Sequence, residues 1–316
     1  MTKGPTPVTA DSPAYERFTP RMALQLAAPH TWPAAILPCL VAVSAAAVTA
    51  EASALMACVL LVICILMQAA VNTFNDYYDF VKGADSADDD VEESDATLVY
   101  NNVDPRSALR LAIGFLAAAF ILGGYAIYCA GWIPLAIGIV GAFFVVVYSA
   151  GKTPLSYLPL GEVVSGVVMG GLIPLACYQV LTGELNWLAF VWAVPEIIGV
   201  GLIMMTNNTC DIEKDIESGR KTLPVVLGRD KARKGYHGAL VVWLVAICVL
   251  VAVFFRAGLI VLPFMLLASY PLLKALFANP LISASRIGAM AQICSVNIAL
   301  GAFYAAAILA NGACII

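Results

Sequence analysis

The sequence predicts an all-α protein, a polytopic membrane bundle of nine transmembrane helices. Hydrophobic residues make up 61% of the 316 residues, and charged residues only 12%, against roughly 25% in an ordinary soluble domain. The charges gather in a few clusters, and the apolar runs between them reach the roughly 20 residues that a helix needs to cross a bilayer. This composition disfavours a soluble enzyme, a nucleic-acid-binding protein and a disordered chain. We expect the lipid bilayer as partner and no nucleic acid.

The predicted helices follow one another closely, and several are joined by very short connections that favour antiparallel packing of neighbours. A polar, proline-rich tail at 1–20 precedes one domain at 21–316, and it lacks the basic and short apolar regions of a cleavable signal peptide. The expected spans are 23–49, 53–78, 106–129, 133–150, 160–181, 187–209, 235–255, 257–277 and 287–311.

The distribution of basic residues predicts the orientation of the bundle. All of the 17 Lys and Arg residues except Arg256 fall in the amino-terminal tail or near the loops that follow the second, fourth, sixth and eighth spans. Basic residues are enriched on the cytoplasmic side of a membrane. We therefore expect a cytoplasmic amino terminus, a carboxyl terminus outside, and a plasma (inner) membrane location.

The nine cysteines include no CxxC pair, and most of them lie inside apolar runs. Cysteines in such places are usually small buried hydrophobic residues. We expect neither a disulfide framework nor a zinc site.

The second and sixth spans each end in a polar cluster. In VNTFNDYYDFVKGAD (71–85) the polar residues recur at helical spacing and share one face; these are Asn72, Asn75, Asp76 and Asp79. In TNNTCDIEKDIESGRKTLP (206–224) the same holds for Asn208, Asp211 and Asp215, with Asn207 beside them. The similarity of the two clusters also suggests a weak internal repeat of two parallel half-bundles.

The chemistry of the two clusters predicts a diphosphate site. A carboxylate near hydrocarbon is costly unless it is paired or functional, and Mg²⁺ favours carboxylates together with a substrate phosphate. Nearby cations suit the remaining phosphate charge; they are Lys82, Lys152, Lys214, Arg220 and Lys221. An apolar cavity beneath such a site would suit a diphosphate with a long hydrocarbon tail.

The motif pair NDYYDFVKGAD (75–85) and NNTCDIEKDIESGRKTLPVVLG (207–228) resembles the UbiA superfamily of intramembrane prenyltransferases. The sequence is most similar to its 1,4-dihydroxy-2-naphthoate polyprenyltransferase branch. That similarity is carried by APHTWPAAILP (28–38), DFVKGAD (79–85), YSAGKTPLSYLPLGEV (148–163) and GRKTLPVVLG (219–228).

The resemblance implies transfer of a polyprenyl group from its diphosphate to an aromatic quinone precursor, with loss of CO₂, giving demethylmenaquinone. It implies that Asp76, Asp79, Asp211 and Asp215 are catalytic and hold Mg²⁺ against the diphosphate. It implies that the four asparagines support the substrates, together with Lys82, Lys152, Arg220 and Lys221.

Several positions depart from the family pattern or admit two interpretations. Ala28 and Cys210 stand where the family often has Arg, and the loop at 86–105 is unusually acidic. His30 either caps a bent helix or lines the site, and Tyr148 either anchors the interface or stabilises a carbocation. The acidic run at 88–90 is interpreted as a solvated loop. Glu196, which lies near mid-membrane by its position in the sixth span, is interpreted as a structural carboxyl group that can be protonated.

Two alternatives remain open at this stage, and a third is disfavoured. One is a family member with another acceptor, such as 4-hydroxybenzoate, haem or a different quinone precursor. A second is an ion-coupled transporter, which would place its polar residues near the membrane midplane. A third, a CDP-alcohol phosphotransferase, lacks its signature in both clusters.

Overall fold

The computed structural model describes residues 15–83, 97–151 and 153–313. Within these residues the chain is helical and contains no strand. The predictions that concern Lys152 and the acidic run at 88–90 lie outside the described residues.

In the first half of the chain the helices are α1 (Pro20–Ala27), η1 (Pro29–Thr31), α2 (Pro33–Thr49), α3 (Ala54–Lys82), α4 (Thr97–Tyr100), α5 (Pro105–Ala130) and α6 (Ile133–Ser149).

The second half continues the same pattern of long helices joined by short ones. Its elements are η2 (Leu155–Tyr157), α7 (Gly161–Ser165), η3 (Gly166–Leu172), α8 (Ile173–Thr182), α9 (Leu188–Trp192), α10 (Val194–Cys210), α11 (Ile212–Glu217), α12 (Leu223–Leu227), α13 (Arg229–Phe254), η4 (Arg256–Ile260), α14 (Leu262–Ala278), η5 (Ser283–Ser285) and α15 (Arg286–Leu309).

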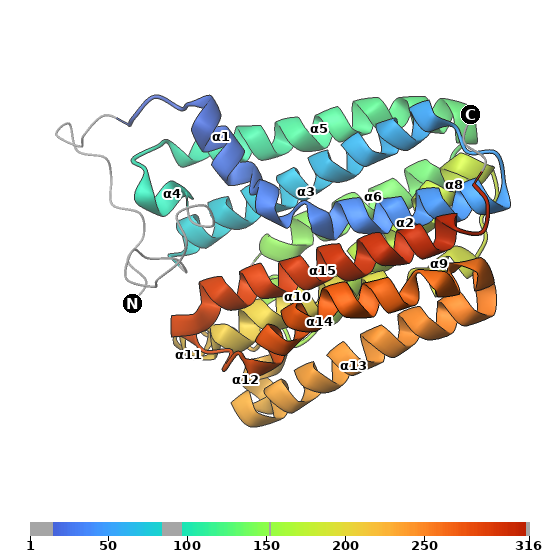
Figure 1. The fold of residues 1–316 in the computed structure, drawn as a ribbon. Helices are drawn as coiled ribbons and strands as arrows, with labels where there is room; N and C mark the ends of the chain where they lie inside the picture. Colours follow the sequence, from blue (N-terminus) through green and yellow to red (C-terminus); the bar gives the residue numbers. More distant parts are fainter. Residues whose placement is uncertain (1–14, 84–96, 152, 314–316) are drawn as a thin grey trace.

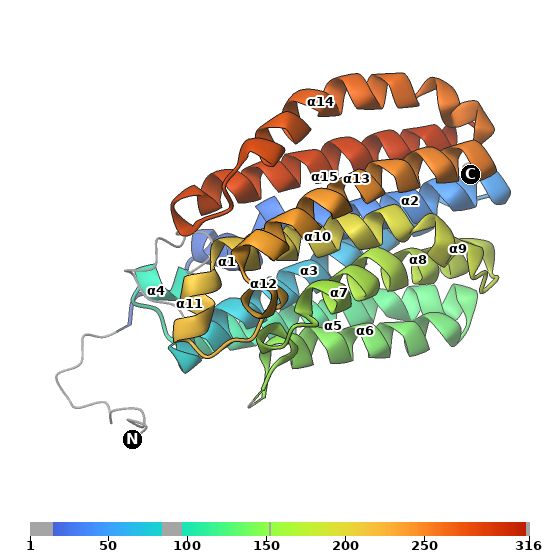
Figure 2. The same cartoon turned by 90° about the horizontal axis from the view of Figure 1, so that it is seen from below.

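The long helices run side by side in one elongated bundle (Figure 1, Figure 2). The short helices α1, α4, α11 and α12 gather at one end, and α9 lies at the opposite end (Figure 1). Helix α3 leads to α4, and helix α10 leads to α11, at the end of the bundle where the short helices gather. Both predicted polar clusters, which lie at the ends of α3 and α10, are therefore at that same end. The end of α15 lies at the other end of the bundle.

Helices lie at each of the nine expected spans, but nine membrane crossings are not established. Five helices of the described chain are long and apolar enough to cross a membrane, and a sixth span results if the bent pair Pro20–Thr31 and Pro33–Thr49 is counted as one. The helices α6, α10 and α14 have 17 residues each, which is near the lower limit for a span. The count of nine therefore stays a prediction.

A sharp break divides the first predicted span near the polar end. The two parts meet at an angle of 56°, where Ala28 adopts a left-handed conformation (φ 46°) and Pro29 follows it. The indole nitrogen of Trp32 donates to the carbonyl of Ala27 at 2.8 Å. This turn leaves backbone carbonyls free to bind side chains of α3.

A wide π-helical turn, η3, brings the fifth span against α10. A Cβ atom at Gly170 would lie 2.5 Å from the backbone of Glu196, and one at Gly166 would lie 2.5 Å from the carbonyl oxygen of Ile197. Only glycine permits this close approach. Glu196 is buried there, and neither carboxylate oxygen has a hydrogen-bond partner among the described residues.

Candidate functional site

A polar chamber lies at the end of the bundle where α3 and α10 finish. It is bounded by α1–α2, α3, η3, α10, α11 and the start of α15. Eight of the predicted site residues line it, namely Asn72, Asn75, Asp76, Asp79, Asn207, Asp211, Asp215 and Arg220. The structure thus brings together the two clusters that the sequence indicated.

The first cluster occupies one face of α3, as its spacing predicts. Asp76 accepts hydrogen bonds from the backbone N–H groups of Thr97 (2.7 Å) and Leu98 (3.3 Å), at the start of α4. Asp79 is paired with Arg220, whose guanidinium group donates to it at 2.9 Å. Four polar side chains spread over two turns of α3 therefore line the chamber, while α4 and Arg220 hold its two carboxylates.

The two asparagines of α3 tie the chamber walls together. Asn72 donates to the Ala27 carbonyl at 3.0 Å and to the Thr31 hydroxyl at 2.8 Å, which links α3 to the break in the first span. Asn75 accepts a hydrogen bond from Ser149 at the end of α6. Their amide groups position the neighbouring helices as well as lining the chamber.

The second cluster differs from its predicted spacing. Helix α10 ends at Cys210 and a turn at Asp211 precedes α11, so the residues do not continue on one helical face. Asn207, four residues before Asp211, lines the chamber, whereas Asn208 is buried and donates to Glu162 at 2.8 Å. The prediction that Asn208 shares the face of the aspartates is therefore wrong.

The buried aspartates of the second cluster favour a cationic partner. Burial raises the pKa of Asp215 to about 6, although a hydrogen bond from Thr222 (2.8 Å) and the charge of Arg220 act in the opposite direction. Burial also raises the pKa of Asp211, against the lowering effect of Arg286. A cation brought close to these carboxyl groups stabilises their ionised form.

Arg286 is the main site residue that the sequence did not indicate. It donates to Asp211 at 3.0 Å and to Asn207 at 2.8 Å from the start of α15. In the sequence, Arg286 lies just before the ninth span and contributes only to the distribution of basic residues that predicts the orientation of the bundle. Only the packing of α15 against α10 shows that this cation reaches the chamber.

The remaining predicted residues lie around the chamber rather than in its wall. Lys82 donates to the backbone of Ser149 at 2.7 Å and lies over the ring of Tyr157. His30 and Lys221 are exposed. Tyr148 is buried and lines a second, apolar pocket.

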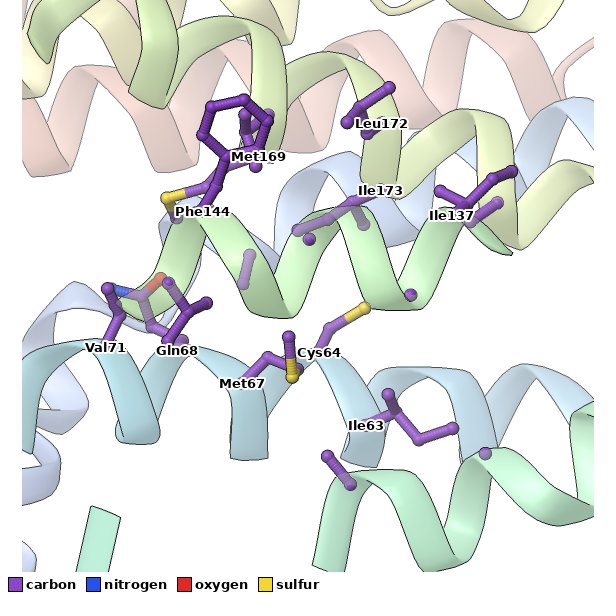
Figure 3. A pocket seen from close by; sticks show the side chains of 18 of the residues that line it. Ile63, Cys64, Met67, Gln68, Val71, Ile137, Phe144, Met169, Leu172 and Ile173 are labelled. Atoms are coloured by element: carbon purple, nitrogen blue, oxygen red, sulfur yellow. The ribbon is translucent and has the colours of Figure 1, made fainter. Parts of the chain in front are cut away.

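The apolar pocket adjoins the polar chamber directly. Its wall comes mainly from α3, α5, α6, η3 and α8, and none of the described residues that line it is charged. Figure 3 shows Ile63, Met67 and Val71 on one side, with Phe144, Met169 and Leu172 across from them. Residues that line both cavities are Gln68, Asn72, Asn75, Met169 and Met204. The combined space suits a molecule with a polar head and a long apolar tail.

The donors of the chamber fit a divalent metal and a diphosphate. Carboxylate and amide oxygens are hard ligands, and Mg²⁺ in proteins is commonly bound through one or two carboxylates and substrate phosphates. Among the described residues, no three carboxylate, thiol or imidazole ligands in the chamber lie within 4.8 Å of one another. A buried nitrogen of Arg220, Nε, has no partner within the described chain, so it can donate to a phosphate oxygen.

Comparison with known proteins gives the family of this chain. Residues 35–281 match the UbiA prenyltransferase family. A 1,4-dihydroxy-2-naphthoate octaprenyltransferase from Bacillus subtilis is 34% identical over 208 residues, which cover 66% of each chain. One from Mycobacterium tuberculosis is 29% identical over 271 residues, 84% of this chain and 91% of the relative. The match therefore spans just under two thirds of the Bacillus protein's length.

A solved structure has the same fold. A UbiA homolog from Archaeoglobus fulgidus, bound to GPP and Mg²⁺, superposes with a TM-score of 0.65 at 18% identity, covering 92% of this chain and 99% of that one. With its apolar helices, its paired polar clusters and these matches, the chain is a multi-pass membrane protein that belongs to the UbiA prenyltransferase family.

Proposed function

We propose that this protein transfers a polyprenyl group from its diphosphate to 1,4-dihydroxy-2-naphthoate with loss of CO₂, giving demethylmenaquinol, which a separate two-electron oxidation converts to demethylmenaquinone. The observation that carries the proposal is the junction of the two cavities. A chamber lined by carboxylates and cations opens into a pocket without charge. A prenyl diphosphate has this same division between a charged head and an apolar tail.

The proposed roles follow from where each side chain lies. Asp76, Asp79, Asp211 and Asp215 would hold Mg²⁺, which when bound neutralises diphosphate charge and helps it depart. Arg220 and Lys214 line the chamber and face the same charge. The carbon–oxygen bond of the prenyl diphosphate breaks, and its electron pair leaves with the diphosphate.

The apolar pocket favours the next step by keeping out water. The allylic cation would otherwise be captured by solvent, and the pocket beside Asn75 is lined by side chains without charge. The ring carbon that bears the carboxylate forms the new carbon–carbon bond with the cation. Its bond to the carboxylate then breaks, so that the electron pair returns to the ring as CO₂ leaves. Tyr148, buried in this pocket, presents a ring that can stabilise the cation.

The naphthoate acceptor is supported by the relatives rather than by the chamber alone. Both bacterial relatives described above carry that activity in their names. The chamber provides a cation for an aromatic carboxylate in Arg286, although Ala28 lacks the charge often found at its position in the family. We therefore place the carboxylate of the acceptor near Arg286, in the chamber that Thr31, Ala34 and Met290 also line.

The chamber would face the cytoplasm of a bacterial plasma membrane, since the basic loops lie at its end of the bundle. An ion-coupled transporter is less well supported, because both carboxylate clusters lie at one end of the bundle and continue into loops. The family match also favours a transferase.

A turnover assay tests the proposal. Purified protein in detergent receives Mg²⁺, a polyprenyl diphosphate and either 1,4-dihydroxy-2-naphthoate or 4-hydroxybenzoate. We expect prenylated naphthoquinone, abolished by Asp76→Ala and by Asp211→Ala. Metal-dependent product from 4-hydroxybenzoate alone would overturn the acceptor. Absence of diphosphate release from a folded protein with either acceptor would overturn the transferase mechanism.

A further inference from the structure

Three cysteine side chains from three different helices meet in the apolar part of the bundle. They are Cys39 of α2, Cys64 of α3 and Cys177 of α8, and their Sγ atoms all lie within 4.8 Å of one another. The Sγ atoms of Cys39 and Cys177 are 3.9 Å apart. Among the described residues, these three are the His, Cys, Asp or Glu side chains whose ligand atoms lie close enough together for all three to bind one metal ion.

The cluster is separate from the polar chamber but can be reached from it. Cys64 and Cys177 line the apolar pocket, and Cys39 is fully buried with its sulfur next to theirs. Figure 3 shows Cys64 in the pocket wall. Cys64 precedes Asn72 by eight residues, or about 12 Å along an ideal helix. A small uncharged molecule that enters the pocket therefore meets the sulfur atoms.

The spacing of the sulfurs suits one ion bound to all three. A centre bonded to three sulfurs through bonds of about 2.3 Å, the length of a zinc–thiolate bond, holds them roughly 3.5 Å apart in a pyramid and roughly 4 Å apart in a flat triangle. The observed 3.9 Å between Cys39 and Cys177 agrees with this. Thiolates select soft ions, so the cluster would not compete for the Mg²⁺ expected at the aspartates.

The charge of the surroundings narrows the choice of ion. A thiol that coordinates a metal is deprotonated, so three such ligands contribute three negative charges. The segments that carry the cysteines, 33–49, 54–75 and 173–182, contain no charged residue, and none lines the pocket. A net charge in such a place costs several kcal/mol or more. A monovalent or divalent ion leaves the assembly anionic, whereas a trivalent one makes it neutral.

We propose that Cys39, Cys64 and Cys177 form a binding site for a soft trivalent metalloid, arsenic(III) or antimony(III), delivered as its uncharged hydroxide. For arsenic, three As–O bonds of As(OH)₃ break and three As–S bonds form. Each thiol proton leaves with a hydroxide, which gives three water molecules. No oxidation or reduction occurs, and both the entering molecule and the bound product are uncharged. The proposal does not rest on the prenyl transfer proposed above, although Cys64 and Cys177 line the same apolar pocket.

The test measures arsenic bound per chain. Full-length protein in detergent, kept reduced with a phosphine, is incubated with arsenite, desalted, and analysed by elemental and native mass spectrometry. We expect one arsenic per chain, with the mass of three protons lost. The triple variant Cys39→Ala/Cys64→Ala/Cys177→Ala should bind none. The matched control Cys58→Ala/Cys248→Ala removes two cysteines outside the cluster and should bind as the parent does.

A second measurement covers the case in which the triple variant fails to fold. In the unaltered protein, arsenite should protect Cys64 and Cys177 from a small maleimide, as read by peptide mass spectrometry, while the exposed Cys58 and Cys129 still react. Arsenic retained by a folded triple variant, or absence of protection at Cys64 and Cys177, would overturn the site. Retention of Cu(I) or Zn²⁺ by the cluster with no binding of arsenite would overturn the charge argument.

Discussion

Each aspartate of the polar chamber is held by a donor from a different part of the chain. Asp76 accepts from the backbone at 97–98, and Asp79 from Arg220. Asp211 accepts from Arg286, and Asp215 from the hydroxyl of Thr222. These contacts fix the carboxylates before any substrate arrives, which lowers the cost of ordering them on binding.

The negative charge of the aspartates in the chamber can be removed with little change of side-chain shape. Asp76→Asn and Asp211→Asn keep most of the hydrogen-bonding shape but remove the negative charge. We expect each to lower kcat/KM by about 10²-fold or more, as for the loss of one electrostatic partner of a transition state. Steady-state kinetics over a Mg²⁺ titration measures this. Asp230→Asn, an acid outside the chamber on α13, serves as control, and an equal loss in it would contradict the assignment.

Arg286 gives a second prediction, because the proposed acceptor carries a carboxylate. Arg286→Gln should lower kcat/KM for the naphthoate by about ten- to a hundredfold, the value of one or two charge-assisted hydrogen bonds. The KM for the prenyl diphosphate should change much less. Arg256→Gln at the opposite end of the bundle is the matched control. An effect confined to the diphosphate would place the acceptor carboxylate elsewhere.

At the scale of elements, the contact between η3 and α10 shapes the wall behind the chamber. Its close approach depends on glycines, and Met169 and Met204 from these elements line both cavities. A change of the spacing between these helices would therefore move the junction of the two cavities.

Gly170→Ala tests that contact. The added Cβ atom would lie 2.5 Å from the backbone of Glu196, so the two helices must separate, and we expect a destabilisation of about 1–3 kcal/mol. Gly238→Ala on α13 has open space around the same atom and should stabilise by about 0.5–1 kcal/mol through helix propensity. Thermal unfolding in detergent compares the stability of the two variants with that of the parent protein. A shift of the unfolding temperature in the same direction in both variants would refute the packing argument.

The apolar pocket gives another prediction for α6. Gly138 lines the pocket, and a Cβ atom there would meet no other atom within 4 Å. A side chain as large as that of Gly138→Leu would enter the space of the tail. We expect the ratio of kcat/KM for long over short prenyl diphosphates to fall about tenfold or more. Gly114→Leu on α5, outside the pocket, should leave the ratio unchanged.

At the scale of the whole molecule, the basic residues and the polar chamber share one end of the bundle. The sequence predicts that this end faces the cytoplasm. The break between α1 and α2, the start of α4 and the short helices α11 and α12 all lie there (Figure 1). Substrates with charged heads would then reach the chamber from the cytoplasm.

Single-cysteine labelling tests the orientation. Glu213→Cys replaces an exposed side chain on α11 at the chamber end, and Glu184→Cys one in the loop between α8 and α9 at the other end. An impermeant maleimide should label the first only in inside-out membrane vesicles and the second only in right-side-out vesicles, above the background of the parent protein. The reverse pattern would invert the proposed topology.

The sequence alone was enough to predict the helical membrane class, the helix positions and the family, and these are confirmed. Hydrophobic length and helical spacing are local properties, so they are visible in the sequence. For the same reason the face shared by Asn72, Asn75, Asp76 and Asp79 could be read directly. The number of membrane crossings stays a prediction, because several helices are close to the minimal length.

Tertiary structure decided what depends on distant contacts. It placed Arg286 against Asp211, turned Asn208 toward Glu162, and joined the apolar pocket to the chamber. It also brought three cysteines from separate helices together. A side chain's partner across the bundle depends on where helices end and how closely they pack. The turn at Asp211 determines where α10 ends, and the glycines of η3 determine how closely η3 packs against α10. The spacing of residues along the chain shows neither the end of the helix nor the closeness of the packing.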